Sequence, residues 1–292
     1  MKAIAAALRF LIFTNLYIAT CVFCFTSKTA WVLNGNAGNF HVNALAFFST
    51  LFLYGFHRIY RRFRLSQDEH REERHQWVDE RKNLYYVIIG LAFLAMISQL
   101  CYMPIRVWIM LLPVGVIAAG YSIPVIKTAQ GWIRIRDISW LKVLWISISY
   151  AWLTTFLPVV YHNPISYLWQ PKVLFIFIEN LIFIFVLAIP FDIRDISYDK
   201  RNSVNTLPIL LGVNGAISLC LKLLCAFIAI VFLHMSYGGL NKYMATALCL
   251  SALEIGVILP LTKPERPNLF FPLAIESSMI LQWTLILVAM YL

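Results

Sequence analysis

Charged side chains are scarce in this sequence. Aspartate, glutamate, lysine and arginine make up 13% of its 292 residues, about half the share found in a typical soluble domain. The mean hydropathy is +0.74, and hydrophobic residues account for 61% of the chain. This composition excludes a soluble globular domain, because so much apolar surface needs lipid around it.

Cysteines and linkers are also few. The chain has six cysteines, and the Cys21–Cys24 pair lies in an apolar run, where packing is a commoner role than redox or zinc chemistry. No low-complexity linker divides the sequence, so we expect one transmembrane domain over residues 1–292. The apolar N-terminus resembles a signal peptide but lacks a small-residue cleavage site, so we expect it to be the first span.

Long apolar runs dominate the chain. A run of about 17 residues or more is long enough to cross a hydrocarbon core as a helix. Because lipid cannot satisfy backbone polar groups, such runs must form helices packed into a bundle. The sequence therefore predicts an all-α polytopic transmembrane bundle with nine spans, at residues 10–26, 40–56, 84–103, 107–123, 141–160, 173–191, 214–234, 243–261 and 270–290.

Basic residues are distributed unevenly between the connections. With the N-terminus inside, nineteen of the 24 lysines and arginines fall on the cytoplasmic side and four on the other. This bias predicts a cytoplasmic N-terminus and an external C-terminus. Because no targeting segment is evident, we expect the membrane to be an inner or plasma membrane. The net charge of +10 then reflects topology and contact with anionic lipids, and we expect no nucleic-acid partner.

Acidic residues are absent before Asp68, yet three of them follow the sixth apolar run directly. Asp192, Asp195 and Asp199 are spaced i, i+3 and i+7, which on a continuous helix places them within about 60° of one another, with Arg194 pointing away. We expect a positive group between these carboxylates. The spacing is compatible either with charges that mark a helix end or with a Mg²⁺–phosphate site.

The stretch DIRDISYDKRNSVNTLPILLG resembles the second aspartate-rich motif of the UbiA-type intramembrane prenyltransferases. The matching residues are Asp192, Asp195, Asp199, Lys200, Arg201, Thr206, Leu207, Pro208, Leu211 and Gly212. A second stretch, after the fourth predicted span, is similar to the family's Tyr-Ser/Thr-x-Pro…Lys segment through Tyr121, Ser122, Pro124 and Lys127. The similarity in layout covers nearly the whole chain.

The resemblance implies transfer of an isoprenyl group from a prenyl diphosphate to an aromatic or lipid acceptor. It implies that Asp192, Asp195 and Asp199 are the catalytic and metal-binding residues and that they bind Mg²⁺, as a single ion in the transferase interpretation given below. The diphosphate would be held by basic residues on the cytoplasmic face, namely His57, Arg58, Arg61, Lys127, Lys200 and Arg201. The remaining partners would be a lipophilic acceptor and membrane lipids.

The chain departs from the family at the end of the second span. There the family carries its first aspartate-rich motif, whereas the corresponding spacing here gives Tyr54, His57 and Arg61. Three interpretations stay open: a transferase in which basic residues replace part of the metal site, a member that binds isoprenoids or lipids without turnover, and a structural or transport protein in which the aspartates pair with arginines of the second span.

Three further acidic residues lie inside predicted spans: Glu179, Glu254 and Glu276. Such residues are costly in lipid. For Glu179 an interhelical hydrogen bond is the expected role, with orientation of an acceptor as the alternative.

Overall fold

The computed structural model describes residues 2–64, 73–124, 126–128, 131–134, 138, 141–201 and 204–292. Apart from one small hairpin, the elements are helical. In chain order they are α1 (Lys2–Phe13), α2 (Leu16–Asn34), α3 (Phe40–Arg64), α4 (Glu73–Glu80), α5 (Lys82–Leu100), α6 (Ile105–Ser122), β1 (Ile126–Thr128), β2 (Gly131–Ile133), α7 (Leu141–His162), η2 (Ile165–Trp169), α8 (Pro171–Arg194), α9 (Ile196–Arg201), α10 (Leu207–Tyr237), α11 (Lys242–Ile258), η3 (Leu259–Leu261), η4 (Phe271–Glu276) and α12 (Ser277–Met290).

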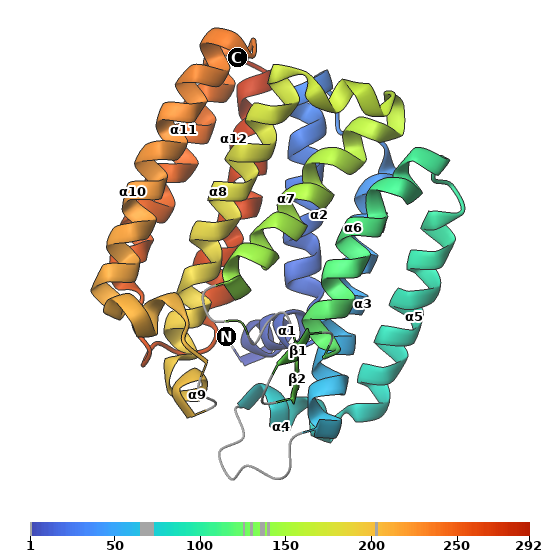
Figure 1. The fold of residues 1–292 in the computed structure, drawn as a ribbon, viewed down its shortest axis with the longest axis vertical. Coiled ribbons are helices and arrows are strands. Elements are labelled where there is room, and N and C mark those ends of the chain that lie inside the picture. Colours follow the sequence, from blue (N-terminus) through green and yellow to red (C-terminus); the bar gives the residue numbers. More distant parts are fainter. Residues whose placement is uncertain are drawn as a thin grey trace.

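The long helices form one bundle (Figure 1). Contacts run round it in the order α2, α3, α6, α7, α8, α10, α11 and α12, and α12 returns to α2, while α5 packs on the outside of α3. The contacts between α2 and α7 cross the middle. A continuous cluster of buried apolar side chains fills the bundle, so the predicted all-α helical bundle is confirmed.

Among the residues that the structure describes, seven helices are long and apolar enough to cross a membrane. Their outer surfaces carry large exposed apolar side chains, such as Leu94 on α5 and Val257 on α11, as expected for helices that face lipid. They account for seven of the nine predicted spans, and α3 and α6 overlap the other two. The protein is an integral membrane protein.

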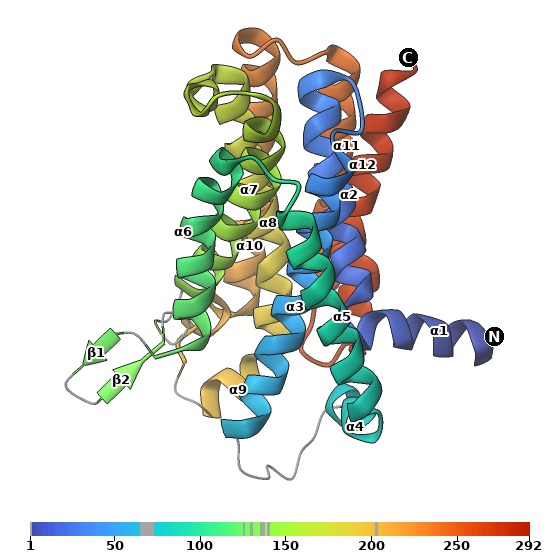
Figure 2. The same cartoon turned by 90° about the vertical axis from the view of Figure 1, so that its right-hand side faces the viewer.

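The first predicted span is wrong in its bounds. The chain breaks at Asn15, whose backbone is left-handed with φ 67° and ψ 8°, a conformation that asparagine tolerates better than most residues. The carbonyls at the end of α1 find other donors: Thr14 Oγ1 donates to Phe10 O (2.7 Å) and Arg58 donates to Phe13 O (2.8 Å). Helix α1 therefore lies across the bundle axis, while α2 alone enters the bundle (Figure 2).

A β-hairpin follows α6, in the connection between the fourth and fifth predicted spans. Strands β1 and β2 pair antiparallel, with Lys127 opposite Trp132. Gly131 has a φ of 122°, which only glycine adopts easily. The hairpin, α1, α4 and α9 all lie at the same end of the bundle (Figure 2), which we call the α9 end.

Candidate active site at the α9 end of the bundle

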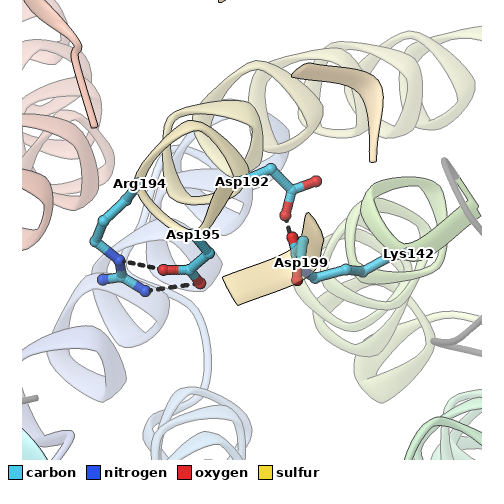
Figure 3. A network of polar contacts seen from close by, with 5 residues as sticks. All are labelled: Lys142, Asp192, Arg194, Asp195 and Asp199. Atoms are coloured by element: carbon cyan, nitrogen blue, oxygen red, sulfur yellow. Dashed lines mark hydrogen bonds and ion pairs between the residues drawn. The ribbon is translucent and has the colours of Figure 1, made fainter. Parts of the chain in front are cut away.

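Three side chains from three helices meet in a compact ionic cluster. Lys142, in the first turn of α7, places its Nζ 2.7 Å from Oδ1 of Asp192 and 3.6 Å from Oδ2 of Asp199 (Figure 3). The side chains are 12%, 4% and 5% exposed, in the same order. We call Lys142, Asp192 and Asp199 the rim triad. The positive group expected between the aspartates is thus a lysine of another helix.

The third aspartate makes a separate ion pair. Arg194 donates to both carboxylate oxygens of Asp195, at 2.7 and 3.1 Å (Figure 3), and its guanidinium lies over the rings of Phe191 and Phe271. The expectation that Arg194 points away from the aspartates is therefore wrong. This pair is more exposed than the triad, at 21% for Arg194 and 28% for Asp195.

Helical phase explains the division. Helix α8 ends at Arg194, and α9 begins at Ile196, but the hydrogen bonds from Asp195 N to Phe191 O and from Asp199 N to Asp195 O carry the helical path across the junction. A spacing of seven residues is nearly two full turns, whereas a spacing of three falls short of one turn by about 60°. Asp192 and Asp199 therefore converge on one lysine, and Asp195 lies to the side.

The rim triad has an excess of negative charge and unused acceptors. When both carboxylates are ionised, one ammonium leaves a net charge of −1. Oδ2 of Asp192 and Oδ2 of Asp199 are buried and have no hydrogen-bond partner in the part of the chain that the structure describes. Burial raises the pKa of Asp199, and the charge of Lys142 opposes that rise. The cluster therefore has the capacity to accept a further cation.

The other predicted phosphate ligands lie around this end with different environments. Lys127, Lys200 and Arg201 are exposed and His57 is half-buried, but Arg58 donates to Phe13 O (2.8 Å) and to Oδ1 of Asn15 (3.2 Å). The side chains of Arg61, Tyr121 and Ser122 lie outside the described part of the chain. Arg58 thus holds the α1–α2 junction, in addition to any role toward phosphate.

Aromatic and hydroxyl groups lie deeper than the triad. Tyr150 is eight residues beyond Lys142 on α7, about 12 Å farther along the axis, and donates to the hydroxyl of Tyr54 at 2.8 Å. Tyr17 is hydrogen-bonded to Ser277. The π-helical turn η4 ends at Glu276, whose carboxylate acts electrostatically on both Tyr17 and Tyr150. Tyr54, which the resemblance aligns with a family aspartate, is therefore hydrogen-bonded to a tyrosine of another helix in the bundle.

Sequence reasoning missed the role of Lys142. The predicted span at residues 141–160 contains this lysine at its start, and a charged residue in the first turn of an apolar helix is the signal that could have marked it. Within the described residues no group of three or more His, Cys, Asp or Glu side chains could hold a metal ion. The carboxylates are instead divided between Lys142 and Arg194.

A second polar cluster lies far from the triad. Glu179 lies on α8, thirteen residues before Asp192 and about 20 Å away along the helix axis. Its Oε1 is hydrogen-bonded to Nδ1 of His234 on α10, at 2.8 Å. This is the interhelical hydrogen bond expected for Glu179. Near it, the ammonium of Lys28 donates to Oδ1 of Asn180 and to Oε1 of Gln282.

Comparison with known families decides the classification. A model described as the UbiA prenyltransferase family matches residues 80–279, more than half of the chain. This chain is a member of the UbiA prenyltransferase family. The match includes the whole rim triad but begins after Tyr54, His57 and Arg61, the residues at which the sequence departs from the UbiA pattern. No curated protein matches the chain.

Solved structures share the UbiA fold at low sequence identity. A UbiA homologue from Archaeoglobus fulgidus bound to GPP and Mg²⁺ is 11% identical, with a TM-score of 0.65 over 97% of this chain and 100% of that one. The same homologue bound to DMAPP and Mg²⁺ gives 0.64 over 97% and 99%, again at 11% identity. An apo homologue from Aeropyrum pernix K1 is 16% identical, with a TM-score of 0.66 over 93% and 98%.

Proposed function

We propose that this chain is an integral-membrane prenyltransferase that transfers an isoprenyl group from a prenyl diphosphate to an aromatic or lipid acceptor. The observation that carries the proposal is the rim triad: buried carboxylates with unused oxygens beside an ammonium, at one end of a UbiA-family bundle. The GPP, DMAPP and Mg²⁺ bound to the homologue from Archaeoglobus fulgidus support the substrate class and the ion.

The donor set fits Mg²⁺. This ion prefers oxygen ligands and uses one or two carboxylates together with substrate phosphate. Oδ2 of Asp192 and Oδ2 of Asp199, neither of which has a hydrogen-bond partner among the described residues, are such ligands. Asp195 is the third proposed ligand, at present paired with Arg194. When bound, the ion would neutralise charge on the departing diphosphate.

Basic side chains at the α9 end would bind the diphosphate itself. Lys127, Lys200 and Arg201 are exposed there, and His57, Arg58 and Arg61 of α3 are the further proposed ligands. Arginine clamps phosphate oxygens with two parallel hydrogen bonds and lysine acts as a point charge. In charge terms this basic set would replace the metal ion that the first aspartate-rich motif of the family would hold.

The bundle interior would receive the isoprenyl chain. Tyr54 and Tyr150 lie deeper than the triad, so their rings would flank the allylic carbon from which the diphosphate departs. Aromatic faces stabilise positive charge, and the buried apolar cluster around them excludes the water that would quench a carbocation. The positive-inside bias supports a site on the cytoplasmic face of the inner or plasma membrane.

The experiment that tests this function uses the purified protein in lipid nanodiscs. Radiolabelled prenyl diphosphates of several chain lengths are supplied with a membrane lipid extract as the source of acceptor. We expect a Mg²⁺-dependent labelled product that the double variant Asp192→Asn/Asp199→Asn does not form. Glu265→Gln, which removes an exposed carboxylate, serves as the matched control and should retain the activity.

Two outcomes would contradict the proposal. A product that forms equally well in the double variant would show that the triad is not the site. Absence of product at every chain length, combined with thermal stabilisation by prenyl diphosphates, would favour a member that binds isoprenoids without turnover.

A further inference from the structure

The Nζ atom of Lys142 lies where a cation shared by two carboxylates would lie. It is 2.7 Å from one carboxylate oxygen of Asp192 and 3.6 Å from one of Asp199. We propose that Lys142 is a tethered cation that competes with a divalent metal for Asp192 and Asp199, and that it leaves this position when the metal binds. The inference rests on the proposed function only in assigning the carboxylates to a metal.

Charge balance makes the two cations mutually exclusive. Two carboxylates and one ammonium sum to −1, so the pair still attracts a metal ion. A divalent ion bound beside the ammonium would change the sum to +1 and bring two positive charges close together, where burial weakens solvent screening. Without the ammonium, the same two carboxylates and a divalent ion sum to zero.

Space leads to the same conclusion. Mg²⁺ binds carboxylate oxygens at about 2.0–2.1 Å in a near-ideal octahedron and keeps several waters. The ammonium occupies the gap between the carboxylates that such a hydrated ion needs.

Lys142 also has a path out of the cluster. Its side chain is 12% exposed, more than either aspartate, and lysine carries its charge on a flexible four-carbon stem. If the ammonium moved outward from the triad, it would meet the phosphate groups of the proposed substrate at the α9 end. The substrate would thereby give the displaced charge a new partner, and metal and diphosphate would each favour binding of the other.

Mn²⁺ alone serves as the probe, titrated into substrate-free protein and followed by electron paramagnetic resonance. We expect Lys142→Met to bind Mn²⁺ at least about tenfold more tightly than the wild type, because the competing charge is gone. Lys263→Met removes an exposed lysine of the η3–η4 connection and should leave the affinity unchanged. Equal or weaker binding by Lys142→Met would overturn the proposal.

Lys142→Met leaves two buried carboxylates uncompensated, and this can prevent folding. Comparing Asp199→Asn with Lys142→Met/Asp199→Asn reduces that problem, because the double variant keeps the net charge of −1 that the wild-type triad has and leaves only Asp192 uncompensated. The double variant should bind Mn²⁺ more tightly than Asp199→Asn alone. If removing Lys142 tightens binding in neither background, there is no competition.

The readout separates this inference from the proposed function. Tighter Mn²⁺ binding without any labelled product would leave the competition standing and refute the transferase. Product formation with no effect of Lys142 on Mn²⁺ affinity would do the reverse.

Discussion

Two lysines of the bundle, the buried Lys28 and the partly buried Lys142, have opposite kinds of partner. Lys28 of α2 is 2% exposed and donates to two neutral amides, Oδ1 of Asn180 at 2.5 Å and Oε1 of Gln282 at 3.1 Å. Lys142 of α7, by contrast, faces two carboxylates. The first lysine meets oxygens that carry no charge, and the second meets more negative charge than it can neutralise.

The surroundings of the two lysines differ in the same sense. Around Lys28 the two amides make further hydrogen bonds of their own. Nδ2 of Asn180 donates to Thr155 Oγ1 (2.9 Å), and Nε2 of Gln282 donates to Ser251 Oγ (2.8 Å). Around Lys142 two carboxylate oxygens, Oδ2 of Asp192 and Oδ2 of Asp199, have no hydrogen-bond partner within the described residues. The polar groups around Lys28 therefore join helices α2, α7, α8, α11 and α12, whereas the rim triad retains capacity for a ligand.

The strongest test of this contrast is Asp192→Asn. In the proposed function it removes charge at the reacting end, so we expect the rate of isoprenyl transfer to fall roughly 100- to 1,000-fold, the usual cost of losing one electrostatic group in a preorganised site. The thermal midpoint in detergent should change little, because Lys142 keeps Asp199 as its partner. A large loss of stability with unchanged transfer would make the triad a structural ion pair.

Lys28→Met should show the reverse pattern. It leaves Oδ1 of Asn180 and Oε1 of Gln282 without their donor, and a buried acceptor without a partner costs about 1–3 kcal/mol. It also removes a positive charge that acts on Glu179. We expect the free energy of unfolding to drop by about 2 kcal/mol or more, with transfer per folded molecule unchanged.

Equilibrium unfolding in detergent and the transfer assay on the same preparation check this prediction. Lys242→Met, which removes an exposed lysine at the opposite end of the bundle, is the control. If Lys28→Met reduces transfer as strongly as Asp192→Asn does, the two regions are not functionally distinct.

The two aspartates of the rim triad could be predicted from the sequence, whereas the positions of Lys142 and Lys28 could not. The i, i+3, i+7 spacing of the aspartates is visible in any helical projection, so Asp192 and Asp199 could be predicted to lie together. Their partner could not, because the position of Lys142 relative to α8 depends on how α7 packs. In the sequence Lys142 looks like one more basic residue of a loop.

The predicted first span, residues 10–26, ends before Lys28, so the sequence did not indicate that this lysine lies inside the bundle. The run Thr26-Ser27-Lys28-Thr29 lowers the hydropathy and favours a span that ends near residue 26. The structure instead begins α2 at Leu16, after the left-handed Asn15, and continues it to Asn34. A polar segment that is compensated by Asn180 and Gln282 is indistinguishable, in sequence, from one that lies in water.

Tyr150→Phe tests the region between the two lysines. It removes the 2.8 Å hydrogen bond to Tyr54 while keeping the ring, and a single buried hydrogen bond contributes about 0.5–1.5 kcal/mol. We expect an unfolding free energy lower by about 1 kcal/mol and a modest loss of transfer. Tyr237→Phe, at an exposed tyrosine at the end of α10, should show neither effect.

The smallest effect is expected for Arg194→Gln, which compares the two ion pairs of the α9 end. The Arg194–Asp195 pair has good geometry, with oxygens at 2.7 and 3.1 Å, but both side chains are more than one fifth exposed. Exposed pairs contribute about 0.2–1 kcal/mol. We therefore expect the unfolding free energy to change by less than about 1 kcal/mol. The rate of isoprenyl transfer should change by less than about fivefold, which corresponds to the same energy.

Thermal unfolding and the transfer assay, run beside Asp192→Asn, measure both quantities. If Arg194→Gln instead abolishes transfer, Asp195 must be held by Arg194 for the reaction, and the exposed pair, rather than the buried triad, controls the site.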